Sequence, residues 1–126
     1  MNDLNLKTEH DKFGQYLRSV RVMKKISIRQ LAKAVNKTPT YISDIERGNN
    51  NPPERKLLDK IILALQLTNF PDIKNNLYDL AAKERNDVPA DIKDYLMKNK
   101  SVLKIIRKAK ESPNEKQIWA KILQII

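Results

Sequence analysis

The sequence predicts an all-α protein in which a compact helical domain precedes a C-terminal helical extension. Apolar residues recur at helical spacing through most of the 126 residues. Runs of alternating apolar and polar residues, which are typical of half-buried strands, are missing, and no Asn-Gly or Asp-Gly hairpin turn occurs. Six prolines and short clusters of Asn, Ser and Thr divide the chain into short helices. We therefore expect two parts, residues 9–70 and residues 71–126.

The chain before residue 37 is predicted to form two helices. The first, over residues 9–24, has one apolar face at spacing i, i+4 and i+7, made of Phe13, Leu17 and Val20. The second, over residues 27–36, begins with a capping box, in which Ser27 and Gln30 satisfy each other's backbone N–H groups. Asn36 ends this helix, because Asn tolerates a left-handed turn better than other residues with a side chain.

A third short helix is expected over residues 38–48. Pro39 occupies its first helical position, where a missing N–H does no harm, and the helix ends on a glycine. Ile42 and Ile45 face inward and set the third helix at a steep angle to the second. Two short helices joined in this way have the geometry of a helix-turn-helix, whose second helix lies in the DNA major groove.

Five further helices follow. Their expected ranges are 53–65, 71–83, 89–98, 101–110 and 112–126. Ser112 and Glu115 have the spacing of a second capping box, at the start of the last helix. This last helix is apolar on more than one side, so its own chain or a second copy must cover it.

Composition favours polyanionic partners and excludes several kinds of site. The chain has 25 Lys and Arg against 15 Asp and Glu, a net charge of +10. It has no cysteine, one histidine and two glycines, which leaves no material for disulfides, thiolate or multi-histidine metal sites, or a glycine-rich phosphate loop. No apolar run approaches the ~20 residues of a membrane span, and the first residues are too polar for a signal peptide. We expect a soluble, cytoplasmic, nucleoid-associated protein without cofactor, metal, membrane contact or small-molecule ligand.

Residues 13–67 resemble the Cro/repressor-type (XRE-type) helix-turn-helix domain, which has the lambda-repressor-like fold. The most specific run is YISDIERG, residues 41–48, followed by Asn51-Pro52-Pro53. Other matching positions are Leu17, Arg18, Arg21, Ser27, Gln30, Leu31, Ala32, Thr38, Pro39, Thr40, Leu58 and Ile61. The family often has Gly where this chain has Lys25, and a Lys in a left-handed turn costs about 1–2 kcal/mol.

The resemblance implies that the helix over residues 38–47 contacts duplex DNA in the major groove. Base edges would be contacted by Thr40, Tyr41, Ser43 and Asp44. Phosphates would be contacted by helix N-termini and by Ser27, Arg29, Lys37, Thr38, Arg47, Asn49 and Asn50. The four base-contact positions hold no Arg, Asn or Gln, so we expect modest specificity of ~1 kcal/mol per base, with DNA shape supplying the rest.

Two acidic residues of this helix have structural interpretations. In the family, the residue matching Glu46 pairs with an arginine of the first helix, here Arg21, and such a pair fixes geometry more than it adds stability. Asp44 is either a base contact or only a solvated charge of the helix. The two carboxylates point in different directions and do not form a catalytic pair.

The leading hypothesis is a sequence-specific DNA-binding transcriptional regulator, a repressor of mobile-element or prophage type, that forms a homodimer through residues 71–126. The alternative is an antitoxin, which would bind its own promoter through the same domain and a toxin protein through the C-terminal helices. An enzyme is disfavoured, because His10 is the one histidine and the carboxylates are scattered. An adaptor that does not touch DNA is disfavoured by the net charge of +10.

Overall fold

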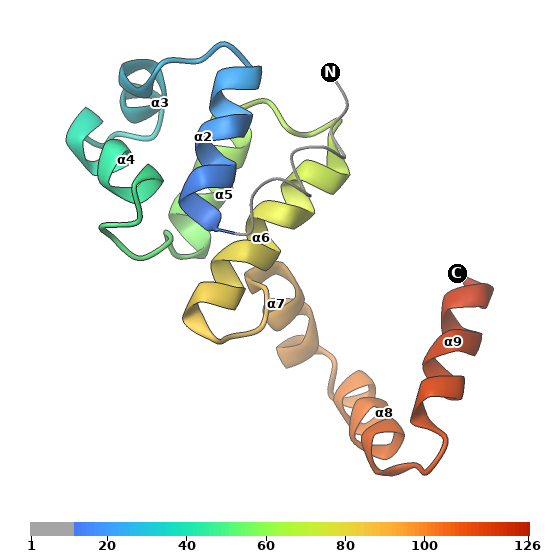
Figure 1. Cartoon of the computed structure of the whole chain (residues 1–126). Helices are drawn as coiled ribbons and strands as arrows, with labels where there is room; N and C mark the ends of the chain where they lie inside the picture. Colours follow the sequence, from blue (N-terminus) through green and yellow to red (C-terminus); the bar gives the residue numbers. More distant parts are fainter. Residues whose placement is uncertain (1–11) are drawn as a thin grey trace. The chain divides into compact units, whose positions relative to one another are not determined.

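The computed structural model describes residues 12–126, and this range is built of helices without strands (Figure 1). The helices are α2 (Phe13–Met23), α3 (Ile28–Ala34), α4 (Pro39–Glu46), α5 (Arg55–Ala64), α6 (Pro71–Arg85), α7 (Ala90–Lys98), α8 (Lys100–Glu111) and α9 (Glu115–Ile125). The all-α prediction is confirmed. Residues 9–11 of the predicted first helix, and His10 with them, lie outside the described residues.

The chain divides into two compact units. The first ends at Asp91, and the second comprises Ile92–Ile126. The sequence-based boundary at residue 70 lies between the expected DNA-binding part and the expected extension. In the structure, the hydrophobic core of the first unit also includes residues of α6, which follows residue 70.

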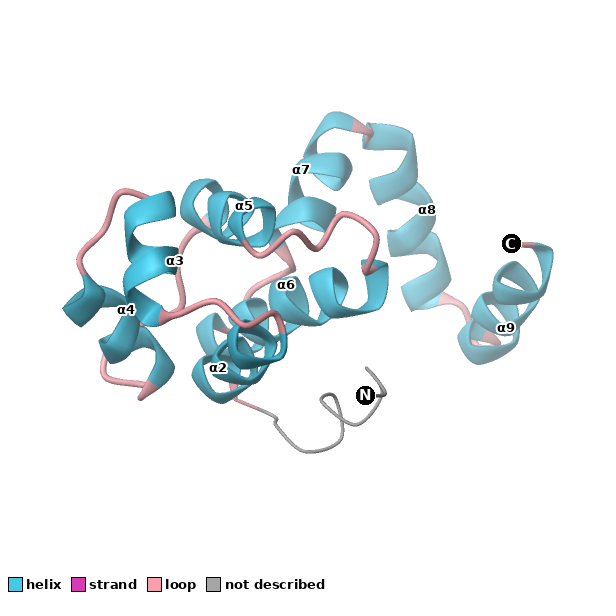
Figure 2. Ribbon diagram, turned by 90° about the horizontal axis from the view of Figure 1, so that it is seen from above, coloured by secondary structure: helices cyan, strands magenta, loops and turns pink. Residues whose placement is uncertain are grey.

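Helix α2 lies at the centre of the first unit. Helix α4 packs on one side of α2 and α6 on the other, while α3 contacts α4 and α5 (Figures 1 and 2). The apolar face of α2 is completely buried, as its helical spacing requires, and consists of Phe13, Tyr16, Leu17 and Val20. This arrangement makes α2 the element against which α4 is positioned.

Helix α6 completes the core of the first unit. Its buried side chains belong to the same hydrophobic cluster as those of α2 and include Ile73, Leu77, Tyr78 and Ala81. The Tyr78 hydroxyl donates to the Asp59 carboxylate of α5, and Asn76 Nδ2 donates to the Tyr16 hydroxyl at 3.1 Å. Burial and the hydrogen bond to Asp59 raise the pKa of Tyr78 above its usual value. The first unit therefore depends on residues beyond the predicted boundary.

The local signals in the helix-turn-helix region are confirmed. Ser27 Oγ accepts from Gln30 N at 3.0 Å, and Gln30 Oε1 accepts from Ser27 N at 2.8 Å, which is the predicted capping box. Asn36 has a left-handed backbone with φ 58°. Lys25 has the same conformation, also with φ 58°, so the chain keeps the family's left-handed turn without its glycine.

The second predicted capping box is wrong. Helix α9 begins at Glu115, and its N-cap residue, Asn114, makes no side-chain capping bond. Ser112 Oγ instead donates to the Lys108 carbonyl at 2.9 Å. The serine therefore satisfies a carbonyl at the end of α8, because a hydroxyl can bond backward to residue i−4 as readily as it can cap the next helix.

Gly14 allows α2 and α4 to approach each other closely. A Cβ atom at this position would lie 2.3 Å from the Ile45 carbonyl oxygen and 2.6 Å from that of Glu46. Because both neighbours are backbone atoms, a larger residue would displace the end of α4. The glycine thus sets the distance between the two helices.

The second unit has almost no core of its own. Helix α8 packs on α9, and Ala109 is the one residue of Ile92–Ile126 that is buried. Large apolar side chains remain exposed, among them Tyr95, Met97, Ile105, Leu123 and Ile125. Across residues 12–126, no helix combines the length and apolarity needed to cross a membrane.

A truncation series tests whether α6 belongs to the first folded unit. We expect a chain that ends at Phe70 to be unfolded, because it lacks the α6 part of the core. Burial of each large apolar side chain contributes about 1.5–3 kcal/mol, and a whole domain is stable by only about 5–15 kcal/mol. A chain that ends at Asp91 is expected to unfold cooperatively when heated and followed by circular dichroism. A cooperative transition of the shorter chain at a similar temperature would contradict this expectation.

Candidate nucleic-acid interface

The candidate interface is the outer face of α4. Thr38 caps the helix, since its Oγ1 accepts from Tyr41 N at 3.1 Å. The inner face is buried and consists of Ile42, Ile45 and Glu46. Helical spacing then places Thr40, Asp44 and Arg47, at i, i+4 and i+7, on the opposite side. The helix is thus anchored by one side and open on the other.

A buried ion pair connects the end of α4 to α2. Arg21 Nε donates to Glu46 Oε2 at 2.6 Å, and Arg21 Nη2 donates to Glu46 Oε1 at 3.0 Å. The third guanidinium nitrogen, Nη1, donates to the Ile26 carbonyl at 2.9 Å. The two residues are only 8% and 7% exposed. Such a bidentate pair fixes the direction of both side chains, and it ties α4 and the α2–α3 turn to the same arginine.

The residues expected to contact bases lie on the first two turns of α4. Thr40 is exposed, and the other three, Tyr41, Ser43 and Asp44, are half-buried. The Lys37 ammonium lies 5.2 Å from the centre of the Tyr41 ring, a cation–π distance. Asp44 Oδ1 accepts from Arg47 Nη2 at 2.8 Å, so the carboxylate orients the guanidinium one turn further on.

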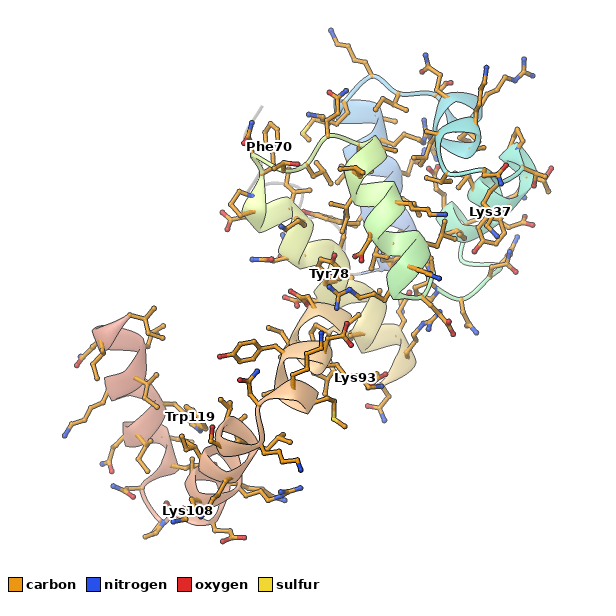
Figure 3. The ribbon with its side chains drawn as sticks, turned by 180° about the vertical axis from the view of Figure 1, so that it is seen from behind. Lys37, Phe70, Tyr78, Lys93, Lys108 and Trp119 are labelled. Atoms are coloured by element: carbon orange, nitrogen blue, oxygen red, sulfur yellow. The ribbon has the colours of Figure 1, made fainter. Side chains whose placement is uncertain are left out.

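The residues expected to contact phosphates are all exposed. They are Ser27, Arg29, Lys37, Thr38, Arg47, Asn49 and Asn50, at the starts of α3 and α4 and in the loop after α4. Figure 3 shows Lys37 in the region of the α3–α4 turn. The hydroxyl oxygens of Ser27 and Thr38 accept helix N–H groups, which leaves both O–H groups as donors toward a phosphate.

Two residues that position this region were not found from the sequence. Gly14 sets the approach of α2 to α4, and a glycine inside a predicted helix is a signal of close packing. Arg85 at the end of α6 donates to the Pro52 carbonyl and lies 3.8 Å from Glu54. These contacts hold the loop that follows α4. No local pattern reveals them, because the partners are more than 30 residues apart.

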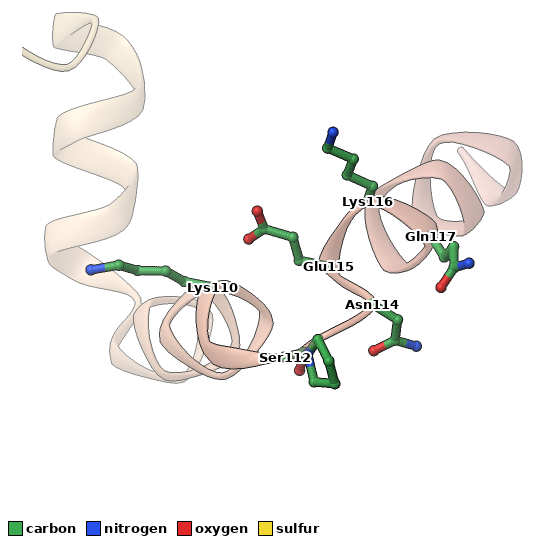
Figure 4. A pocket seen from close by; sticks show the side chains of 7 residues that line it. Lys110, Ser112, Asn114, Glu115, Lys116 and Gln117 are labelled. Atoms are coloured by element: carbon green, nitrogen blue, oxygen red, sulfur yellow. The ribbon is translucent and has the colours of Figure 1, made fainter.

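The turn between α8 and α9 carries a shallow hollow of about 390 Å³. It is lined by Lys110, Ser112, Pro113, Asn114, Glu115, Lys116 and Gln117. Figure 4 shows that these side chains point in different directions. Because the polar groups do not converge, the hollow has none of the geometry of a small-molecule site.

Comparison with known proteins identifies the class of the first unit. Residues 17–69 match the family model described as Helix-turn-helix, and the match confirms the resemblance to Cro/repressor-type domains. This segment is therefore a helix-turn-helix domain of that type, a DNA-binding domain family without enzymatic activity. The protein is accordingly a DNA-binding transcriptional regulator. No curated protein and no solved structure is significantly similar to the chain.

Removal of one partner of the buried pair should destabilise the domain. We expect Glu46→Ala to lower the free energy of unfolding by about 3–5 kcal/mol, because the Arg21 guanidinium is left buried without its counter-charge. Urea denaturation checks this value. The matched control is Glu84→Ala on the exposed side of α6, where a change within about 0.5 kcal/mol is expected. Equal effects of the two substitutions would show that the pair does not hold α4.

Proposed function

We propose that the protein is a transcriptional repressor that inserts α4 into the major groove of duplex DNA. The observation that carries this proposal is the asymmetry of α4. One face is locked to the core by Ile42, Ile45 and the Glu46 carboxylate, while the opposite face is polar and solvent-accessible. Occupation of an operator by such a domain blocks polymerase without any catalytic step.

Specificity in this proposal comes from short polar side chains. The Thr40 and Ser43 hydroxyls donate to or accept from base edges, and the Tyr41 ring contacts a thymine methyl group. The Asp44 carboxylate accepts from a cytosine amino group or directs the Arg47 guanidinium. Backbone N–H groups at the starts of α3 and α4, together with Arg29, contact phosphates.

We further propose that the repressor is a homodimer formed through the C-terminal helices. The second unit supports this proposal, because its exposed apolar side chains need a cover that its own chain does not supply. A two-fold dimer binds two half-sites about 34–36 Å apart, which matches one turn of the duplex.

An antitoxin function is the second candidate, and the same exposed apolar surface favours it. In that case a toxin protein, and not a second copy of the chain, buries the exposed apolar side chains of the second unit. A small toxin-like reading frame next to this one, and a stable complex between the two products, would distinguish the candidates.

Selection of bound sites from random duplex DNA tests the assigned face of α4. We expect Thr40→Ala to weaken binding to the selected site by about 1 kcal/mol, roughly fivefold, and to relax the preference at one base position. Asp44→Ala should change the selected sequence at a second position. Thr68→Ala, at an exposed threonine after α5, is the matched control and should leave the selected sequence unchanged. An identical selected sequence for Thr40→Ala, Asp44→Ala and the unsubstituted chain would contradict the assignment.

Light scattering tests the dimer. We expect a mass of twice the 14.7 kDa chain at high micromolar concentration. Leu123→Asp should give monomers, because Leu123 on α9 is 77% exposed and would be covered in the dimer. The matched control is Leu63→Asp on α5, where the leucine is 72% exposed and no interface is proposed. A monomer of the unsubstituted chain, with and without operator DNA, would contradict the proposal.

A further inference from the structure

The positive charge of the second unit is unusually dense. Residues 92–126 contain nine Lys and Arg against three Asp and Glu, a net charge of +6 in 35 residues. The whole chain has a net charge of +10, so most of the excess lies in this short unit. The helix-turn-helix function proposed for α4 makes no use of this charge.

Helix α8 separates its charged and apolar residues onto two sides. The apolar side consists of Val102, Ile105, Ile106 and Ala109. The opposite side, which we call the basic face of α8, consists of Lys100, Lys104, Arg107 and Lys108. Figure 3 marks Lys108 on α8 and Trp119 on α9. Glu111 is the helix's one acidic residue, and at i+3 from Lys108 and i+4 from Arg107 it lies at the C-terminal end of the same face.

The basic face of α8 is free to meet an external anion. All four of its side chains are exposed. Within the described part of the chain, none of them forms an ion pair. Four cations held together at one face repel each other, so a polyanion that neutralises them is strongly favoured.

We propose that the basic face of α8 is a second DNA contact, which binds the phosphodiester backbone without sequence preference. From Lys100 to Lys108 the helix rises about 12 Å, and a duplex presents one phosphate charge per about 1.7 Å of its axis. Several phosphates therefore lie within reach of the face. The inference rests on the proposed DNA-binding function, and it gives the second unit a function of its own.

The packing of α8 favours DNA over an anionic membrane surface. A helix that lies in a membrane interface must bury its apolar side among the lipid chains. In α8 this side is already covered in part within the protein: Ala109 is buried and Val102 and Ile106 are half-buried, while Ile105 is 56% exposed. The basic face, by contrast, has no such cover. A backbone phosphate needs only the exposed cations.

The salt dependence of DNA binding by the full chain tests this inference. The probe is a fluorescein-labelled duplex of arbitrary sequence, titrated at salt concentrations between about 50 and 200 mM. The variant Lys104→Gln/Lys108→Gln should lower the slope of log Kd against log salt by about 0.9 for each phosphate that is no longer neutralised, hence by up to about 1.8. Lys104→Arg/Lys108→Arg should retain the original slope, since arginine keeps the charge. Lys116→Gln/Lys121→Gln on α9 removes the same charge from the same unit and should leave the slope unchanged.

The outcomes separate this inference from the proposed function. If the unsubstituted chain and Lys104→Gln/Lys108→Gln bind DNA with the same salt slope, the second DNA contact is overturned and the proposed function of α4 is not affected. An equal fall in slope for both glutamine pairs overturns the second DNA contact as well, because the effect then reflects net charge only. A chain that binds no duplex at any salt concentration overturns both proposals. If Lys104→Gln/Lys108→Gln loses binding to phosphatidylserine vesicles but keeps the DNA slope of the unsubstituted chain, the basic face of α8 binds lipid and the second DNA contact is overturned.

Discussion

The buried ion pair between Arg21 and Glu46 is the constraint on which the presentation of α4 depends. Helix α4 has only eight residues, too few to be stable alone, and its direction is set by contacts with α2. The pair fixes the end of α4 through two hydrogen bonds, and Gly14 lets the helix backbones approach at the same place. These contacts are all made by the inner face of α4. The polar residues of the outer face are therefore left accessible to solvent.

Much of the helix-turn-helix could be predicted from sequence, because its signals are local. The capping box at Ser27, the left-handed Asn36 and the proline at the start of α4 each depend on neighbours within a few residues. The packing of α6 and the contact between Arg85 and Pro52 could not be predicted, since they join distant segments. The error at Ser112 has a local cause: the same hydroxyl can serve the helix on either side, and the sequence does not decide between them.

The two units divide the chain by the kind of surface that each presents. The first unit hides its apolar residues in one core and exposes a short polar helix. The second unit buries only Ala109 and exposes both apolar side chains and a dense positive charge. We propose that external partners cover these surfaces, since the unit has almost no core of its own. DNA backbone for the basic face of α8 and a second copy for the apolar residues are compatible, because they use different residues.

Site-directed DNA cleavage probes the insertion of α4 into the major groove most directly. The sequence has no cysteine, so Thr40→Cys can carry an iron chelate at a single point on the outer face of α4. We expect strand cleavage at one position in each half-site of the selected duplex, with the offset between strands that is characteristic of the major groove. The same reagent on Asn75→Cys, at an exposed position of α6, should give none. Cleavage from Asn75→Cys and none from Thr40→Cys would contradict the insertion of α4.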